Sequence, residues 1–186
     1  MKILKNFLKT IIKYFAFFIV KFFNKIRIGR LFLESLNEGT SNLTKKIFNK
    51  DIHLNFYIPN ELILYRVESF NSKEPETIDW IDKFDRESIF WDIGSNIGLF
   101  SCYAASKKNC VVYSFEPSVF NLEILCKNIS LNKLNEKITV FPLPITNTFK
   151  DSKFKYSSTK KGGAISTFGE DFTYDGTKLN SIFEYK

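Results

Sequence analysis

Apolar and polar positions in the second half of the chain fall into blocks of two lengths. Short apolar runs at residues 89–91, 111–115 and 138–143 have the composition of buried parallel strands. Between them, residues 99–106 and 119–131 repeat their apolar positions with the period of a helix. Helix-length crossovers between strands make a parallel sheet, and such connections are right-handed. The pattern therefore predicts an α/β fold built as β-α-β-α-β.

The chain before this core has weaker patterns. Residues 52–57 and 62–67 alternate between apolar and polar side chains, which predicts the two strands of a hairpin around Pro59. The polar stretch 69–77 is expected to be a loop, and residues 77–84 are expected to form a short helix. These elements would lead into the parallel sheet.

The first 30 residues carry the excess positive charge of the chain. The chain has 27 Lys and Arg residues against 20 Asp and Glu, and residues 1–30 hold eight of the basic residues and none of the acidic ones. The remainder is close to neutral. A nucleic-acid-binding protein more often carries its positive charge on the folded domain, so we expect no nucleic-acid partner.

The same segment has the pattern of a basic amphipathic helix, with basic residues over about half of a helical wheel and mostly Phe and Ile over the rest. Its longest uncharged apolar run, residues 14–20, is shorter than the roughly 20 residues of a membrane span. Two interpretations stay open: the apolar face packs on its own domain, or residues 1–30 make a peripheral contact with anionic lipid.

We divide the chain into an N-terminal helical segment (1–50), a lead-in hairpin and helix (51–88) and a core (89–186).

Cysteine and histidine residues form no metal motif. Cys102, Cys110 and Cys126 are odd in number and lack Cys-x-x-Cys spacing, and His53 is the only histidine. We therefore expect neither a disulfide framework nor a bound metal, and a cytoplasmic location. If residues 1–30 contact lipid, the protein would lie on the inner face of the cytoplasmic membrane. His53 falls on a predicted strand upstream of the core and is expected to be structural.

Candidate ligand-binding residues lie where the first two core strands end. Asp92 follows the first strand and precedes a turn with Gly94 and Gly98, and Glu116 follows the second strand. Ligands of parallel sheets bind at the carboxyl ends of the strands. Glu116 lies 22 residues beyond Gly94, the spacing at which a carboxylate reaches ribose hydroxyls. A plain strand-to-helix turn would explain the glycines but not the second carboxylate, so we predict a nucleoside ligand.

Two nucleoside cofactors compete for this site. The pyrophosphate of NAD favours a Gly-x-Gly-x-x-Gly loop without a nearby anion, whereas this loop is Gly-x-x-x-Gly with Asp92 beside it. S-Adenosylmethionine has a sulfonium and an ammonium group against one carboxylate, and its net positive charge is attracted by a carboxylate. Electrostatics therefore favours S-adenosylmethionine, and an NAD-dependent oxidoreductase stays as an alternative.

The same residues resemble the FkbM-type family of S-adenosylmethionine-dependent methyltransferases. The resemblance rests on the segments WDIGSNIGLFSCYAA, VYSFEPSVFNLEILCKNISLN and KGGAISTFG and on an upstream KEPET, and it covers roughly residues 55–186. Ser95 stands where the family often has Ala. The resemblance implies a Rossmann-like fold and methyl transfer to a small-molecule or glycan hydroxyl, on a sugar or a secondary metabolite.

The resemblance also implies roles for individual residues, although it assigns no catalytic residue. The loop on the methionine side of the cofactor would contain Asp92, Gly94, Ser95, Asn96 and Gly98. Glu116 would hold the ribose, the turn beside the adenosine would contain Pro117, Ser118 and Asn121, and Glu74 would approach the amino group.

Members of this family continue into a fourth strand that ends in an acidic motif, and residues 181–186 resemble the helix just before that strand. We therefore expect a methyltransferase fold that is incomplete at its C-terminus, with an unpaired edge on its first core strand. The alternative function is an inactive truncated remnant, or a membrane-associated binding module without catalysis.

Overall fold

The computed structural model describes residues 2–49, 51–148 and 151–186. The chain divides into two compact units, one that ends at Leu43 and one that comprises Thr44–Lys186. The two units are described separately below.

The N-terminal unit consists of two helices, α1 (Lys2–Asn24) and α2 (Gly29–Ser41). They meet where the rings of Phe23 and Phe32 stack with centroids 4.1 Å apart. Gly29 makes this turn possible, because a Cβ atom there would lie 1.8 Å from the backbone oxygen of Phe23. None of the described helices combines the length and hydrophobicity of a transmembrane span.

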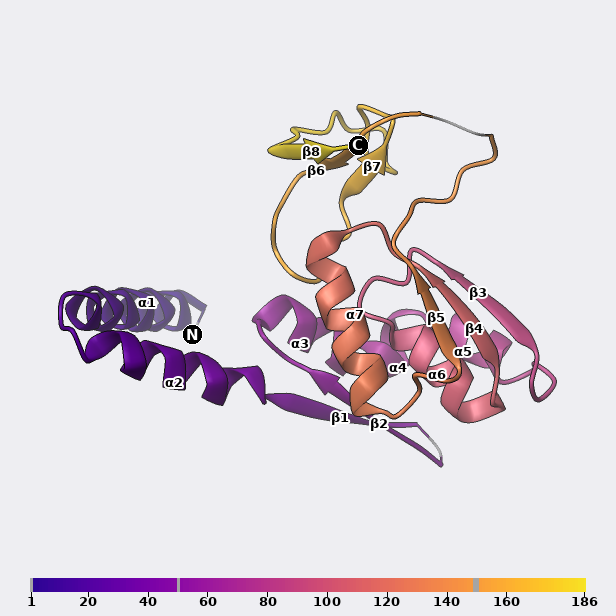
Figure 1. Cartoon of the computed structure of the whole chain (residues 1–186), viewed down its shortest axis with the longest axis horizontal. Coiled ribbons are helices and arrows are strands. Elements are labelled where there is room, and N and C mark those ends of the chain that lie inside the picture. Colours follow the sequence, from indigo (N-terminus) through magenta and orange to yellow (C-terminus); the bar gives the residue numbers. More distant parts are fainter. Residues whose placement is uncertain (1, 50, 149–150) are drawn as a thin grey trace. The chain divides into compact units, whose positions relative to one another are not determined.

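The core of the second unit is a parallel sheet with helices on one face (Figure 1). The predicted β-α-β-α-β succession is confirmed, with β3 (Ile89–Ile93), α6 (Leu99–Lys108), β4 (Val111–Phe115), α7 (Val119–Leu131) and β5 (Ile138–Phe141). The strands lie in the order β3-β4-β5. Phe90, Val112 and Ile138 point toward the helices and are buried. The chain therefore has a mixed α/β fold.

A hairpin of two antiparallel strands packs on α6 and α7. It consists of β1 (Thr44–Asn49) and β2 (Ile52–Tyr57). Side chains of α7 and of Asn132, the residue directly after it, bind the backbone of β2. Asn128 Oδ1 accepts a hydrogen bond from the N–H of Tyr57 at 2.9 Å, and Asn132 exchanges two hydrogen bonds with the backbone of Asn55, each 2.8 Å long. The hairpin thus adds a third layer beside the helices.

The predicted strand over residues 62–67 is wrong, because these residues form the helix α3 (Glu61–Glu68). Asn60 precedes the helix, and its side chain accepts a hydrogen bond from the N–H of Ile63 at 2.9 Å. Such an N-cap satisfies a donor that the first turn leaves open. Ile63 and Val67 then share one face of the helix and are both buried. The chain after β2 therefore enters a helix instead of turning back as a hairpin.

The loop predicted over residues 69–77 is also wrong, since two short helices occupy most of it. They are α4 (Phe70–Lys73) and α5 (Pro75–Ile81). Pro75 takes the first position of α5, where a helix needs no N–H donor and the fixed φ of proline is favourable. The helix predicted over residues 77–84 is confirmed in part, because α5 begins and ends earlier.

A small antiparallel sheet follows the core, with its strands in the order β7-β6-β8. Its strands are β6 (Phe154–Tyr156), β7 (Ser166–Phe168) and β8 (Phe183–Tyr185). Tyr156 anchors it, because its side chain is buried and its hydroxyl accepts a hydrogen bond from the N–H of Val119 at 3.1 Å. The helix expected over residues 181–186 is wrong. Phe183 and Tyr185 both contact the ring of Tyr156, as alternate side chains of one strand do.

The second face of the parallel sheet is apolar and exposed. Ile89, Trp91 and Ile93 on β3 are each more than half exposed. Ring contacts continue from Trp91 to Phe115 and from Phe115 to Phe141. The expected unpaired edge is confirmed, since within the described residues β3 has a hydrogen-bonded neighbour on one side only. Parallel sheets are ordinarily covered on both faces, whereas this one leaves an apolar face open.

Candidate functional site

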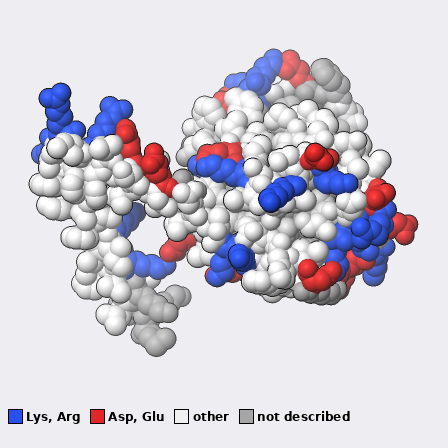
Figure 2. All heavy atoms as spheres, turned by 60° about the horizontal axis from the view of Figure 1, so that its bottom comes forward, with Lys and Arg blue, Asp and Glu red and all other residues white. Residues whose placement is uncertain are grey.

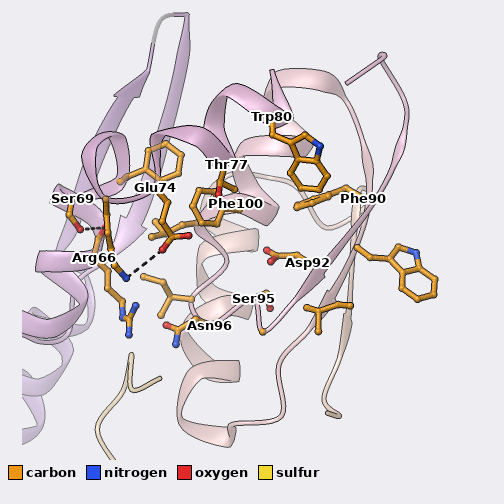
Figure 3. A pocket seen from close by; sticks show the side chains of 17 residues that line it. Arg66, Ser69, Glu74, Thr77, Trp80, Phe90, Asp92, Ser95, Asn96 and Phe100 are labelled. Atoms are coloured by element: carbon orange, nitrogen blue, oxygen red, sulfur yellow. Dashed lines mark hydrogen bonds and ion pairs between the residues drawn. The ribbon is translucent and has the colours of Figure 1, made fainter. Parts of the chain in front are cut away.

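A cavity of about 440 Å³ lies at the carboxyl end of β3 (Figure 3). Residues of α3, α4 and α5 and of the connections between them line it together with the end of β3 and the loop that follows. Its lining combines the rings of Phe70, Trp80, Phe90 and Phe100 with the charged groups of Arg66, Lys73, Glu74 and Asp92. Sites for small molecules typically combine apolar walls with a few polar groups in this way.

Asp92 points into this cavity from β3 (Figure 3). Its Oδ2 accepts a hydrogen bond from the hydroxyl of Ser101 at 2.5 Å, and that hydroxyl lies 2.6 Å from the hydroxyl of Ser114. Burial raises the pKa of the Asp92 carboxyl group, the hydrogen bonds from Ser101 oppose this rise, and the charge of Glu74 adds to it. A cationic ligand would stabilise the ionised form that burial disfavours.

The loop after β3 is held against the end of β4. The N–H groups of Gly94 and Ser95 both donate to the backbone oxygen of Phe115, at 2.8 and 3.1 Å. Gly94 and Gly98 have φ angles of +82° and +81°, which favour glycine. A Cβ atom at Gly98 would lie 2.4 Å from Leu125 Cδ1, whereas no atom lies within 4 Å of the Cβ position at Gly94. Gly98 therefore lets the loop pack on α7, and Gly94 leaves open space that a ligand can approach.

Glu116 lies at the end of β4 and is only 5% exposed. Its Oε1 accepts a hydrogen bond from the N–H of Ser118 and its Oε2 accepts one from the N–H of Asn96, both at 2.8 Å. Burial raises the pKa of the Glu116 carboxyl group, these hydrogen bonds lower it, and the charge of Asp92 raises it. The carboxyl groups of Asp92 and Glu116 are thus close enough to repel each other at one end of the sheet.

The structure brings most of the predicted residues together in two adjoining hollows. The cavity is lined by Glu74, Asp92, Gly94, Ser95 and Asn96, and a smaller hollow of about 160 Å³ is lined by Gly94, Asn96, Glu116, Pro117, Ser118 and Asn121. Gly94 and Asn96 border both. Among the predicted residues only Gly98 lines neither, because it lies under the loop against Leu125.

Two buried oxygen atoms on this loop have no hydrogen-bond partner within the described structure: Ser95 Oγ and Asn96 Oδ1. Buried polar atoms are almost always paired, so these two acceptors are candidates for a ligand that donates hydrogen bonds. The rest of the Asn96 side chain is fixed, because its Nδ2 donates to the backbone oxygen of Gly163 at 2.8 Å. The acceptors and the open space at Gly94 fit the ammonium group and the net positive charge of S-adenosylmethionine.

Most of the other lining residues were not predicted from the sequence, among them the charged Arg66 and Lys73 and the aromatic Trp80. Lys73 Nζ lies 3.5 Å from Glu74 Oε1. Burial lowers the pKa of Arg66, and the charges of Glu74 and Glu116 raise it. The two cations therefore lie beside the carboxylates of the site. They lie on the separate short helices α3 and α4, which the sequence pattern predicted as a strand and a loop, and no local spacing indicated that they share a site.

No family model and no curated protein matches the chain. Solved structures match parts of it. A transferase from Pyrococcus horikoshii is 16% identical over 56% of this chain and 37% of its own, with a TM-score of 0.38. TYW2 from M. jannaschii, solved in complex with AdoMet, is 19% identical over 52% of this chain and 42% of its own, with a TM-score of 0.39.

The tRNA m1G37 methyltransferase of M. jannaschii is 22% identical over 52% of this chain and 28% of its own, with a TM-score of 0.36. The chain spans less than half the length of each of these proteins. The likeness is a distant, partial one to S-adenosylmethionine-dependent methyltransferases.

Proposed function

We propose that this chain binds S-adenosylmethionine at the carboxyl end of its parallel sheet and supports methyl transfer. The supporting observation is the pair of carboxylates in the cavity, which lie beside the cations Arg66 and Lys73. The carboxyl groups of Glu74 and Asp92 point into it from opposite walls, among aromatic rings (Figure 3). Carboxylates and ring faces both stabilise a cation. The pyrophosphate of a dinucleotide would instead meet the like charge of Asp92.

Three parts of the cofactor have suitable partners. The ribose would lie in the smaller hollow beside Glu116, whose Oε2 accepts a hydrogen bond from Asn96 and has capacity for a second from a ribose hydroxyl. Ser95 Oγ and Asn96 Oδ1 would accept hydrogen bonds from the ammonium group. The cofactor carboxylate would be directed toward Arg66.

The residues of the site contribute position and charge. When bound, S-adenosylmethionine supplies an electrophilic methyl group on a cationic sulfur for attack by an acceptor oxygen. Asp92 is oriented by Ser101, and the loop with Gly94 and Ser95 is tied to Phe115, so the site is arranged before the ligand arrives. Holding reactants in line in this way is a large source of rate enhancement in group transfer.

The acceptor in this proposal is a hydroxyl group of a sugar or a secondary metabolite. The support is the sequence resemblance to FkbM-type methyltransferases in the loop at 91–105, in the segment at 112–132 and in the segment at 161–169. In the structure, the backbone oxygen of Gly163 accepts hydrogen bonds from Asn96 Nδ2 and Asn121 Nδ2, at 2.8 and 2.9 Å. These three sequence motifs therefore meet at one site.

A second candidate function is binding of the cofactor without catalysis. It is favoured by the place of the cavity at the end of β3, which is an edge strand of the parallel sheet in the described part of the chain. A methyl-transfer site normally excludes water around the reacting groups. The same fold would then act as a binding module or as a truncated remnant.

Transfer of a tritiated methyl group to a cell-envelope glycan extract separates the two candidates. Methyl transfer predicts label in the glycan fraction that falls by at least about tenfold in Asp92→Asn, because a charge contact to the cation is lost. Asp85→Asn, an exposed carboxylate outside both hollows, is the matched control and should keep full labelling. Cofactor binding without any labelling would favour the binding module, and absence of both would exclude the two candidates together.

A further inference from the structure

The N-terminal unit carries a continuous apolar surface that the proposed function does not use. It consists of α1 side chains at helical spacing that are between 47% and 70% exposed: Leu4, Phe7, Ile11, Phe15, Phe18 and Phe22. Successive members are three or four positions apart, so they share one face of the helix. We call this set the aromatic face of α1.

The contact between α1 and α2 leaves this face open. Helix α2 packs against a neighbouring stripe of α1, where Ile19 and Phe23 are partly buried and Phe23 stacks on Phe32. An apolar face this large on a charged helix is typical of a surface that contacts a partner.

The basic side chains of α1 indicate a partner with negative charge. Within α1 there are several lysines and no acidic residue. Lys9 and Lys13 lie one helical turn apart on the side of the helix away from the aromatic face, and Lys21 lies at its margin. In Figure 2 the N-terminal unit, at the left, presents a mostly uncharged surface with basic and acidic side chains at its edges.

We propose that α1 lies in the plane of an anionic lipid surface, with its aromatic face in the interfacial layer and its lysines beside the headgroups. Amphipathic helices of this composition bind membranes in that orientation. The lysines interrupt the apolar run too often for the helix to cross a bilayer. A second copy of α1 would offer these lysines no acidic partner, because α1 contains no Asp or Glu.

Co-sedimentation of the full chain with lipid vesicles tests this proposal. The probes are vesicles of phosphatidylcholine alone and of phosphatidylcholine mixed with phosphatidylglycerol. We expect binding to the anionic vesicles, weaker binding to the neutral ones, and loss of binding as salt is raised, because salt screens exposed charges. Equal binding to both vesicles, or no binding to the anionic ones, would overturn the proposal.

Two variants assign the effect to α1. The double variant Lys9→Glu, Lys13→Glu should lower the vesicle partition coefficient by roughly tenfold or more, since each lysine near an anionic surface contributes appreciably. Phe15→Ser, Phe18→Ser should lower it by a similar amount, and circular dichroism checks that its helix content is kept. If that variant loses helix, the charge variant decides the question alone.

The matched control reverses the charge of two exposed lysines of the second unit, with the substitutions Lys46→Glu and Lys83→Glu. It changes the net charge by the same amount as the α1 charge variant, and it should keep its partition coefficient within about twofold. An equal loss in the control would show a general charge effect and overturn the assignment to α1. Self-association that Phe15→Ser, Phe18→Ser abolishes, with no vesicle binding by the full chain, would show that α1 binds a second copy instead.

Discussion

At the residue scale, the site depends on two carboxyl groups whose pKa is raised by burial. Asp92 and Glu116 both have raised pKa values, and each is partly compensated by hydrogen bonds from its neighbours. The position of both carboxylates at strand ends could be predicted from the sequence, because a short apolar run that stops at an acidic residue is a local pattern. It could not show the unpaired Ser95 Oγ or the nearby Arg66, since these depend on helices far from the loop in sequence.

Replacement of Asp92 by Asn should weaken S-adenosylmethionine binding by about tenfold to a hundredfold, because a buried charge opposite the cation is lost while the shape is kept. Isothermal titration calorimetry measures the affinity. Asp85→Asn should bind like the unmodified chain. Unchanged affinity in Asp92→Asn would remove this residue from the site.

The affinity for S-adenosylmethionine should rise with pH in the acid range. The pKa of Asp92 in the folded protein is above its ordinary value, so the group stays protonated to higher pH than in the unfolded chain. Its contribution to stability is therefore largest at low pH and is lost as pH rises through the folded-state pKa. Because the cationic ligand favours the carboxylate, binding releases protons in that pH range. Titrations in buffers of different ionisation enthalpy detect this release, and an affinity that falls with rising pH would contradict the assignment.

Asn128→Ala should destabilise the second unit by about 2 kcal/mol or more. The change leaves two buried backbone groups without partners, the N–H of Tyr57 and the carbonyl of Ile97, which the Asn128 side chain binds at 2.9 and 2.8 Å. Urea unfolding measures the free energy. Asn135→Ala, at an exposed position, should change it by less than about 0.5 kcal/mol, and an equal effect of both variants would contradict the contact.

Elements with strong local patterns were predictable, and those that depend on distant partners were not. The three core strands could be predicted because burial against the helices requires a short apolar run in each strand. The glycine loop marks the end of the first strand. The apolar run of Leu62, Ile63 and Leu64 predicts a strand at α3. Asn60 and the four-residue spacing of Ile63 and Val67 indicate the helix that is found.

The strand over residues 52–57 was predicted and is β2, whereas its partner β1 and the sheet β7-β6-β8 could not be predicted, for a different reason. In β1 only Ile47 is buried, so the strand shows almost no alternation and exists because it pairs with β2. The strands β6, β7 and β8 are three residues each, too short to establish a period. Their partners lie far along the chain, as in the pairing of Phe154 with Tyr185.

The exposed edge of β3 should govern the solubility of the second unit. Ile89→Lys places a charge on an edge strand at a position that is 65% exposed, which should reduce self-association with a stability change within about 0.5 kcal/mol. Light scattering against protein concentration measures the first effect and urea unfolding the second. Ile89→Val is the control and should associate as the unmodified chain does. Undiminished association in Ile89→Lys would show that another surface is responsible.

The whole molecule combines two units of different chemistry. The N-terminal unit contributes most of the excess positive charge and an exposed aromatic face, whereas the apolar core begins at Ile47 and lies in the second unit. Both proposed sites are thus confined to one unit each. Failure of lipid binding would leave the cofactor site unaffected, and the reverse also holds.

The most direct test of the central claim is a calorimetric titration of the full chain with S-adenosylmethionine and, separately, with NAD. The cavity lined by Glu74 and Asp92 predicts saturable binding of the cationic nucleoside at one site per chain and no measurable heat with the dinucleotide. A protein that is folded by circular dichroism yet gives no heat with S-adenosylmethionine, or that binds NAD instead, would contradict the account.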